Sequence, residues 1–309
     1  MELNEIPKIS VVVPVKNEGD KIENCLEAIF NQTFKPFGVM VVDGHSTDNT
    51  VENAKKYPIR VFYENYCTRA GACKVGVENA EGEFIAFTDA DCVVKSDWLE
   101  NLIKRFDDDI VGVGGGIENI GEGIWKKSIA FSVGTFLGSA CSVQGRLYPE
   151  KRYVKSISGC NSMYRKKDLL TVGSFDVNLS TAEDAELNSR LLKIGKLLYI
   201  PDAVILHNHN RGLKEFAKRM QQYGYGRVKS GLWGMQLVPP LFFFFLLMSL
   251  SVTPLIFLFM FNIYIVLLII MGIKFAIRMR DLNYLYSIPI VYLIIHGAYT
   301  IGVGKGIIK

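Results

Sequence analysis

The last quarter of this 309-residue chain is almost uniformly apolar, whereas charged residues are concentrated in the first two thirds. The stretch from Leu237 to Ile273 contains no charged side chain. One helix of that length would overshoot a bilayer, because roughly 20 residues cross the hydrocarbon core. We therefore expect a break near Pro254 into two helices, followed by a third span at about Tyr284 to Val303. Two spans with a re-entrant segment are the alternative.

Charge and N-terminal composition predict on which side of the membrane the rest of the chain lies. Lys274, Arg278 and Arg280 follow the apolar stretch, and the positive-inside rule places such residues in the cytoplasm. The segment Met1 to Lys8 contains two glutamates and a proline, so it cannot form the apolar core of a signal peptide. We expect a multi-pass protein of the cell membrane whose N-terminal domain is cytoplasmic.

Composition also narrows the range of partners. The net charge of +4 is small, and basic residues are interspersed with acidic ones, so nothing indicates a nucleic-acid partner. The six cysteines include no C-x-x-C pair, which argues against a zinc site or a disulfide framework. These features fit a reducing, cytosolic setting.

Strand and helix patterns alternate through the first ninety or so residues. Apolar runs at Ile9–Val15, Val39–Val42, Ile59–Tyr63 and Phe84–Thr88 are separated by helical patterns. This alternation predicts an α/β fold with a mostly parallel sheet and helices on both faces. The first strand is not followed by G-x-G-x-x-G, and no P-loop motif occurs, so neither of those nucleotide sites is indicated.

The fourth apolar run ends in two carboxylates, Asp89 and Asp91. Ligands of open α/β sheets bind beyond the carboxyl ends of the strands. Hard divalent cations prefer carboxylate oxygens. We therefore expect Asp89 and Asp91 to hold Mg²⁺ or Mn²⁺ against a nucleotide diphosphate. An ordinary acidic turn after a strand is the alternative.

Three segments occur in order along this predicted sheet: V-V-V-P-V-K-N-E from Val11, V-V-D-G-H-S-T-D-N-T from Val41 and F-T-D-A-D from Phe87. Together they resemble the signature segments of family 2 glycosyltransferases with the GT-A fold. The resemblance implies that the loop from Pro14 to Glu18 and the carboxylate of Asp43 hold the nucleoside. It also implies that Arg69 faces the diphosphate, which a guanidinium binds well. The implied nucleotide-sugar site is made of Pro14, Val15, Asn17, Glu18, Asp43, Arg69 and Asp89.

A second acidic pair, Glu183 and Asp184, opens a predicted helix. Acids at a helix N-terminus are stabilised by the macrodipole, so simple capping is one interpretation. The sequence E-D-x-x-L, ending at Leu187, is similar to the family's acceptor-side motif, and this resemblance implies that Asp184 is the catalytic base, with Glu183 beside it. A hydroxyl acceptor must lose its proton as it attacks the anomeric carbon, and a positioned carboxylate performs this step.

Two histidines, His207 and His209, follow the strand pattern at Ala203–Leu206. Alternation along a strand would place both imidazoles on one side. Either is a candidate third metal ligand, and an imidazole ligand would favour Mn²⁺ over Mg²⁺. Hydrogen-bonded structural histidines are the alternative.

The segment between the strands and the apolar spans is amphipathic. From Lys214 to Tyr223, Phe216 and Met220 lie opposite basic side chains, a pattern suited to an anionic lipid interface. The Q-Q-Y-G-Y-G-R sequence that ends at Arg227 resembles membrane-bound family 2 enzymes related to exopolysaccharide and succinoglycan sugar transferases.

These observations predict three parts: a GT-A glycosyltransferase domain at 1–211, an amphipathic interfacial helix at 212–236 and a transmembrane region at 237–309. The resemblance implies an inverting, metal-dependent glycosyltransferase. It would move a sugar from a nucleotide-diphosphate donor to a hydroxyl of a membrane-associated, lipid-linked glycan. A polyprenyl-phosphate sugar synthase and an inactive nucleotide-binding membrane scaffold are the alternatives.

Overall fold

The protein folds into two compact units. The computed structural model describes residues 7–140, 147–208 and 212–308. The first unit takes in the residues up to 118 together with 147–208, and the second takes in 119–140 together with 212–308. The expected first domain, 1–211, was continuous, whereas the structure assigns residues 119–140 to the unit that also holds the apolar helices.

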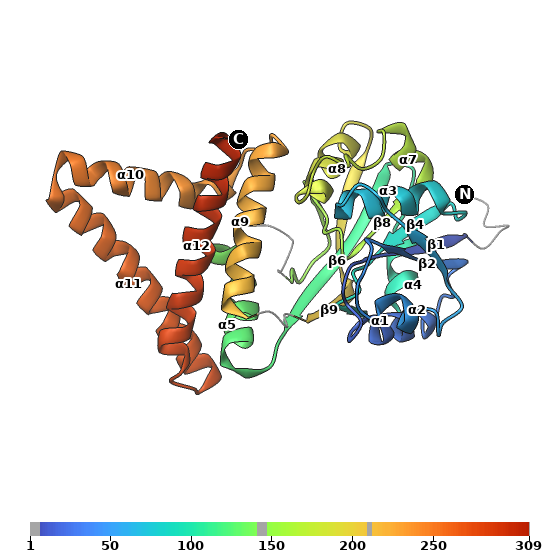
Figure 1. The fold of residues 1–309 in the computed structure, drawn as a ribbon, viewed down its shortest axis with the longest axis horizontal. Helices are drawn as coiled ribbons and strands as arrows, with labels where there is room; N and C mark the ends of the chain where they lie inside the picture. Colours follow the sequence, from blue (N-terminus) through green and yellow to red (C-terminus); the bar gives the residue numbers. More distant parts are fainter. Residues whose placement is uncertain (1–6, 141–146, 209–211, 309) are drawn as a thin grey trace. The chain divides into compact units, whose positions relative to one another are not determined.

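The described residues of the first unit form a nine-stranded sheet in the order β3-β2-β1-β4-β8-β6-β9-β5, with β7 paired to β9 (Figure 1). The strands are β1 (Ile9–Val15), β2 (Gly38–Asp43), β3 (Arg60–Tyr63), β4 (Phe84–Phe87), β5 (Cys92–Val94), β6 (Ile110–Ile120), β7 (Arg152–Val154), β8 (Ser162–Arg165) and β9 (Lys196–Asn208). The helices are α1 (Ile22–Phe30), α2 (Thr50–Ala54), α3 (Arg69–Asn79), α4 (Trp98–Ile103), α7 (Lys166–Thr171) and α8 (Glu183–Leu191).

The predicted α/β architecture is confirmed, and the sheet is mixed. β3, β2, β1 and β4 are parallel to one another, as the strand–helix alternation predicts. β8 pairs antiparallel with both β4 and β6, and β5 and β7 pair antiparallel with β9. Sequence periodicity gives the strands but not their pairing, so this second half of the sheet could not be oriented in advance.

Alternating side chains divide the core between the two faces of the sheet. Val11 and Val13 pack with α1 and α4 on one face, whereas Val12 packs with α3, α7 and α8 on the other. All three valines are fully buried. Successive strand residues point to opposite faces, so a strand with helices on both sides must be apolar throughout.

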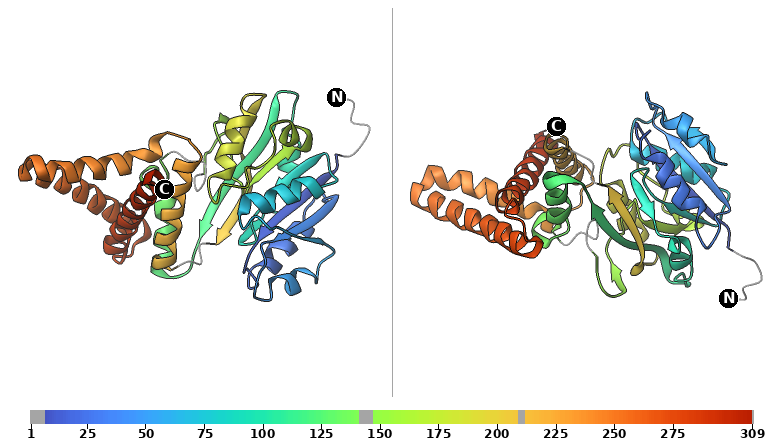
Figure 2. Two further views of the ribbon diagram at one scale, coloured as in Figure 1. Left: turned by 45° about the horizontal axis from the view of Figure 1, so that its top comes forward. Right: turned by 90° about the horizontal axis from the view of Figure 1, so that it is seen from below.

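The second unit is helical in its described residues (Figure 2). Its elements are α5 (Gly123–Val133), α6 (Phe136–Ser139), α9 (Leu213–Lys229), the 3₁₀ turn η1 (Met235–Leu237), α10 (Val238–Val252), α11 (Pro254–Met279) and α12 (Tyr284–Ile308). The predicted break near Pro254 is present between α10 and α11. Among the described residues, three helices are long and apolar enough to cross a membrane: α10 extended by η1, α11 and α12.

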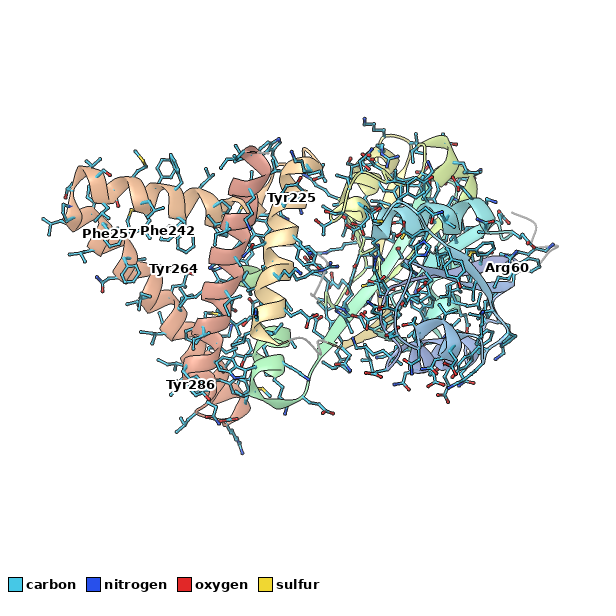
Figure 3. All side chains as sticks on the ribbon, in the orientation of Figure 1. Arg60, Tyr225, Phe242, Phe257, Tyr264 and Tyr286 are labelled. Carbon is cyan, nitrogen blue, oxygen red and sulfur yellow. The ribbon has the colours of Figure 1, made fainter. Side chains whose placement is uncertain are left out.

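Aromatic side chains pack the apolar helices against one another (Figure 3). The ring of Phe242 on α10 lies 5.3 Å from that of Tyr264 on α11, measured between centroids. On α5, Phe131 stacks on Phe275 of α11, with centroids 5.5 Å apart. Phe216 and Met220 of α9, which were expected to face lipid, are buried in this same core.

Glycines allow α9 and α12 to approach each other closely. A Cβ atom at Gly302 would lie 2.1 Å from the carbonyl oxygen of Gln221, and one at Gly224 would lie 2.2 Å from that of Tyr299. Real side chains cannot occupy such positions, and backbone atoms do not move aside cheaply. The contact between these two helices therefore requires glycine on both.

We predict that Gly302→Ala destabilises the second unit, whereas Gly304→Ala on the same helix does not. Alanine normally stabilises a helix by about 0.5–1 kcal/mol relative to glycine, and a Cβ at Gly304 meets nothing within 4 Å. At Gly302 the overpacking penalty of about 1–3 kcal/mol should outweigh that gain. Melting temperatures of the two variants in detergent measure the difference. Equal melting temperatures would contradict the close helix contact.

Candidate functional site

The carboxyl ends of the parallel strands bring the predicted nucleoside residues together. β1 and β2 pair in register with Val15 opposite Asp43. Phe87 of β4 lies opposite Val12 of β1, so Asp89 follows at the same edge of the sheet. Parallel strands end on the same side, and ligands of open α/β sheets bind there.

Asp43 is tied into the turn that follows its own strand. Its Oδ1 accepts a hydrogen bond of 2.5 Å from the Ser46 hydroxyl, and its Oδ2 accepts one of 2.9 Å from the Ser46 amide. The side chain is 1% exposed. A carboxylate has about four acceptor positions, so Asp43 keeps capacity for a further donor. Its visible role is to shape the loop.

The loop after β1 and the loop after β2 are hydrogen-bonded to each other. The Asn17 amide N–H donates to Ser46 Oγ at 2.8 Å, and the Asn17 side-chain oxygen accepts from the Thr47 amide at 2.8 Å. Asn17 has φ of 56°, a left-handed conformation that asparagine tolerates better than most residues. The Glu18 amide donates to Thr50 Oγ1 at 2.9 Å. The two signature segments therefore form one shared loop structure.

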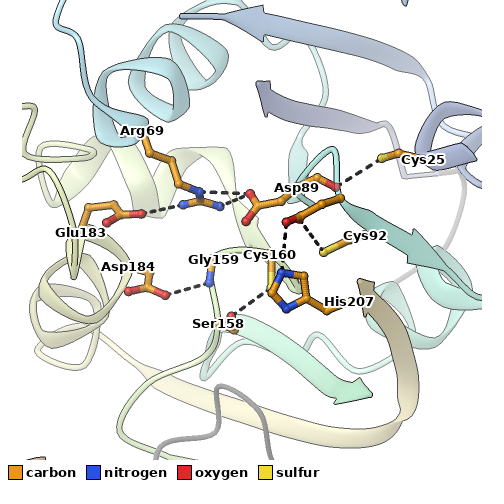
Figure 4. Close-up of polar contacts among 11 residues, drawn as sticks. Cys25, Arg69, Asp89, Cys92, Ser158, Gly159, Cys160, Glu183, Asp184 and His207 are labelled. Atoms are coloured by element: carbon orange, nitrogen blue, oxygen red, sulfur yellow. Dashed lines mark hydrogen bonds and ion pairs between the residues drawn. The ribbon is translucent and has the colours of Figure 1, made fainter. Parts of the chain in front are cut away.

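Arg69 joins the two predicted acidic pairs (Figure 4). Its Nε and Nη2 donate to one oxygen of Asp89 at 3.1 and 2.6 Å, and its Nη1 donates to Glu183 at 2.7 Å. Thr68 starts this helix by accepting a hydrogen bond from the Gly71 amide at 3.0 Å. Arg69 was expected to face a diphosphate; in the structure its guanidinium is held between two carboxylates.

Burial and neighbouring charges have opposite effects on the pKa values of Arg69 and Glu183. Burial disfavours the charged form of Arg69, yet the negative charges around it, that of Asp89 first, together outweigh that effect and raise its pKa well above the usual value. Burial raises the pKa of Glu183, and the charge of Arg69 only partly offsets the rise. The Glu183 side chain is 7% exposed and that of Asp89 is 30% exposed. Asp89 is thus the more accessible of the two carboxylates.

Asp184 is oriented by backbone amides. Its Oδ2 accepts a hydrogen bond of 2.9 Å from the Gly159 amide, and its Oδ1 accepts one of 2.7 Å from the Ala185 amide. Figure 4 shows Asp184 close to Glu183, which contacts Arg69, and pointing toward Gly159. A carboxylate fixed in this way is preorganised to accept a proton from a bound group.

Asn161 holds the Gly159 segment in place. Its amide donates to the carbonyl oxygens of Gly116 and Ala203 at 2.8 and 2.9 Å, and its oxygen accepts from the Trp98 indole at 2.8 Å. All three partners come from different parts of the chain, and Asn161 is fully buried. The sequence does not reveal these contacts, because the three partners of Asn161 are distant from it along the chain.

Asp91 and His207 meet beside Cys92. His207 Nε2 lies 3.3 Å from Asp91 Oδ2, because Cys92 of β5 is paired in register with His207 of β9. Candidate ligand atoms of Asp91, Cys92 and His207 all lie within 4.8 Å of one another. His209, the other predicted ligand, lies outside the described residues. Cys92 was not predicted as a ligand, and its only sequence signal is that it follows Asp91.

The Asp91–His207 contact fits a divalent cation. Burial disfavours the protonated imidazole of His207, but the hydrogen bond and the charge of Asp91 outweigh this and raise its pKa. Asp91 and His207, with Cys92 close by, would hold such a cation. Carboxylate oxygen with imidazole nitrogen suits Mn²⁺ better than Mg²⁺. Asp89 lies two residues away, but its bound oxygen is already occupied by Arg69.

Residues 10–173 match the sequence profile described as Glycosyl transferase family 2. The chain belongs to that family. The match spans more than half of the chain and includes the first three predicted motifs, so the resemblance seen in the sequence is confirmed. As a member of family 2, the protein is a glycosyltransferase.

Two archaeal relatives extend the likeness beyond this segment. A dolichyl N-acetyl-α-D-glucosaminyl phosphate 3-β-D-2,3-diacetamido-2,3-dideoxy-β-D-glucuronosyltransferase from Methanococcus voltae is 27% identical, with 97% of each chain covered. Glycosyltransferase AglE from Haloferax volcanii is 25% identical over 72% of this chain and 74% of its own. The similarity to the first relative includes the apolar C-terminal helices.

Solved structures show the same fold. Mannosyltransferase PcManGT from Pyrobaculum calidifontis, solved with GDP-Man and Mn²⁺, has a TM-score of 0.66 and 18% identity. It covers 98% of this chain, and this chain covers 88% of it. Residues 1–349 of Staphylococcus aureus TarS with UDP-GlcNAc give a TM-score of 0.52 over 73% of this chain and 68% of that chain, at 20% identity. These likenesses confirm the GT-A fold.

We predict that Arg69→Met lowers the free energy of unfolding by about 3 kcal/mol, because it leaves Glu183 buried without a partner. The double variant Arg69→Met/Glu183→Gln should recover part of that loss. A double-mutant cycle from chemical denaturation measures the coupling between the two residues. Additive effects of the two substitutions would show that the Arg69–Glu183 pair contributes nothing.

Proposed function

We propose that this protein is an inverting glycosyltransferase that moves a sugar from a nucleotide-diphosphate donor to a hydroxyl of a lipid-linked glycan. The observation that carries the proposal is the hydrogen-bonded bridge from Asp89, at the end of β4, through Arg69 to Glu183, the residue that precedes Asp184 on α8. A single displacement needs groups that stabilise the negative charge of the leaving diphosphate and a base that takes the proton of the acceptor. The acids after β4 would serve the diphosphate, and Asp184 of α8 would be the base.

The donor would bind along the carboxyl ends of β1, β2 and β4. Pro14, Val15 and Asn17 with Glu18 would line the nucleoside, and Asp43 would accept a hydrogen bond from it. Asp91 and His207, with Asp89 nearby, would hold a divalent cation, which would supply positive charge to the leaving diphosphate. The neighbouring structure solved with GDP-Man and Mn²⁺ supports both the donor class and the metal.

The acceptor step depends on Asp184. As the acceptor hydroxyl oxygen forms its bond to the anomeric carbon, Asp184 takes the hydroxyl proton, and the bond from that carbon to the diphosphate breaks. Attack from the face opposite the leaving group inverts the anomeric configuration. The Gly159 amide fixes the carboxylate in position for this transfer. Glu183, held by Arg69, is a positioning residue for Asp184.

The second unit and the relatives support a lipid-linked acceptor and a cytoplasmic position of the catalytic unit. The Methanococcus voltae relative is named for a dolichyl-phosphate-linked sugar acceptor and is similar along its whole length. Lys274, Arg278 and Arg280 at the end of α11 favour the cytoplasmic side for the catalytic unit. The protein would thus act at the cytoplasmic surface of the cell membrane.

We predict that Asp184→Asn abolishes sugar transfer to a lipid-linked saccharide and leaves donor binding unchanged. The amide keeps the size of the side chain but cannot accept the proton. Glu186→Gln is the matched control, because Glu186 lies on the same helix turn and is paired with Arg190 at 2.6 Å. Transfer is measured with a radiolabelled donor, and donor binding by thermal shift.

The same assay distinguishes a polyprenyl-phosphate sugar synthase. A phosphate acceptor is already ionised and needs no base. Full turnover by Asp184→Asn with polyprenyl phosphate as acceptor would therefore contradict the proposed base and favour that synthase.

We predict that the cation-dependent part of donor binding requires Asp91. A screen of UDP-, GDP- and dTDP-sugars should identify one donor that raises the melting temperature with Mn²⁺ and less so with EDTA. Asp91→Asn should lose the Mn²⁺-dependent part of the shift. Asp109→Asn, which removes an exposed carboxylate paired with Lys196, should retain it. An unchanged Mn²⁺ response in Asp91→Asn would place the cation elsewhere.

A further inference from the structure

The charged helix α9 lies lengthwise against α12, one of the helices apolar enough to cross a membrane. Gly224 of α9 packs on the backbone of Tyr299 and Val303, and Gly306 of α12 packs on Val228. Lys305 Nζ donates to Gln221 Oε1 at 2.9 Å. The two helices run side by side in all three views (Figures 1 and 2). The contact continues to the last turn of α12.

The outer face of α9 is ionised. Lys214, Glu215, Lys218 and Lys229 are exposed, and they extend from its first turn to its last residue. Charged side chains are costly in hydrocarbon and are found at its surface or facing water. α9 starts only five residues after β9 ends, so it stays on the same side of the membrane as the first unit. Because α12 packs along the length of α9, it must lie at the same depth in the membrane as α9.

α12 also makes polar contacts with α5 and with the segment that follows it. Ser287 accepts a hydrogen bond from Ser128 of α5 at 2.8 Å, and the Tyr292 hydroxyl bonds to Thr135 at 2.8 Å. His296 Nε2 bonds to the carbonyl oxygen of Leu137 at 2.9 Å. α5 also carries adjacent lysines at 126 and 127. α12 therefore packs against both α5 and α9.

α10 and α11 have different surroundings. In the most apolar window of each of these two helices 17% of the residues are buried, against 50% in α12. Large apolar side chains such as Phe244, Leu255 and Phe259 are more than half exposed. In the figures these two helices extend away from the α9–α12 pair as a hairpin (Figure 1). Lipid is the medium that such surfaces fit.

We propose that α12 does not cross the membrane: α5, α9 and α12 form a layer at the lipid headgroups, and the α10–α11 hairpin alone enters the hydrocarbon. The hairpin enters and returns, so the chain has an even number of crossings and its C-terminus lies on the side of the catalytic unit. The partner of this layer is the membrane surface, with the lysines of α9 facing its anionic headgroups. Three spans, as the sequence predicted, would place the C-terminus on the opposite side.

The location of the C-terminus tests this directly in the full-length protein. Green fluorescent protein and alkaline phosphatase are fused in turn after Lys309, because the first is fluorescent only in the cytoplasm and the second active only outside it. We expect a fluorescent first fusion, an inactive second one, and N- and C-terminal epitope tags that are digested from the same side of sealed vesicles. An active phosphatase fusion with a tag protected on the catalytic side would overturn the proposal.

A matched pair of lysine substitutions tests the depth of each helix without any fusion. Leu293 of α12 and Leu267 of α11 are 41% and 40% exposed, and both lie near the middle of their helices. A lysine at an interfacial helix reaches water through its own stem, whereas one at mid-membrane does not.

We expect Leu293→Lys to leave the amount of folded, membrane-extracted protein close to that of the unmodified chain, and Leu267→Lys to lose most of it. Equal loss in both variants would show that α12 spans the membrane as α11 does. Equal retention would show that α11 does not enter the hydrocarbon, which also contradicts the proposal. Size-exclusion chromatography after detergent extraction quantifies the folded fraction.

Discussion

The site depends on one guanidinium shared by two carboxylates. Arg69 holds Asp89 from the end of β4 and Glu183 from the first turn of α8, so it joins the donor side of the sheet edge to the acceptor side. Burial opposes the charge on both Glu183 and Arg69, and the attraction of Arg69 to Asp89 and to Glu183 opposes that cost. Asp184 then takes its position from its neighbour and from the Gly159 amide.

The second unit combines apolar helices with a helix that carries exposed charged side chains. α12 is apolar by composition yet buries half of its most apolar window against protein. Three of its side chains are hydrogen-bonded inside the unit: Ser287 to Ser128, Tyr292 to Thr135 and His296 to the carbonyl oxygen of Leu137. Residues 119–140 interrupt the catalytic unit in sequence because their apolar side chains, such as Ile129, are buried with α12. The second unit therefore includes a segment that lies, in sequence, between two parts of the first unit.

The comparisons and the geometry of the site supply different information. The family match shows that the protein is a glycosyltransferase, and the likeness to solved structures shows the GT-A fold. The geometry adds that Asp43 is bound to Ser46, that Arg69 is not free to meet a diphosphate without releasing a carboxylate, and that Cys92 accompanies Asp91 and His207. None of these contacts is visible in a motif.

The sequence alone determined the four parallel strands, the break at Pro254 and the acids at the ends of β4 and at the start of α8. Those features depend on local periodicity, on proline chemistry and on the rule that parallel strands end at one edge, so a linear pattern contains them. Only the tertiary structure decided the antiparallel half of the sheet, the partners of Arg69 and the unit to which residues 119–140 belong. The surroundings of α9 and α12 were likewise decided only by the tertiary structure. Hydropathy records how apolar a helix is, but whether Phe216 or Tyr292 is covered by lipid or by another helix depends on contacts between residues distant in sequence.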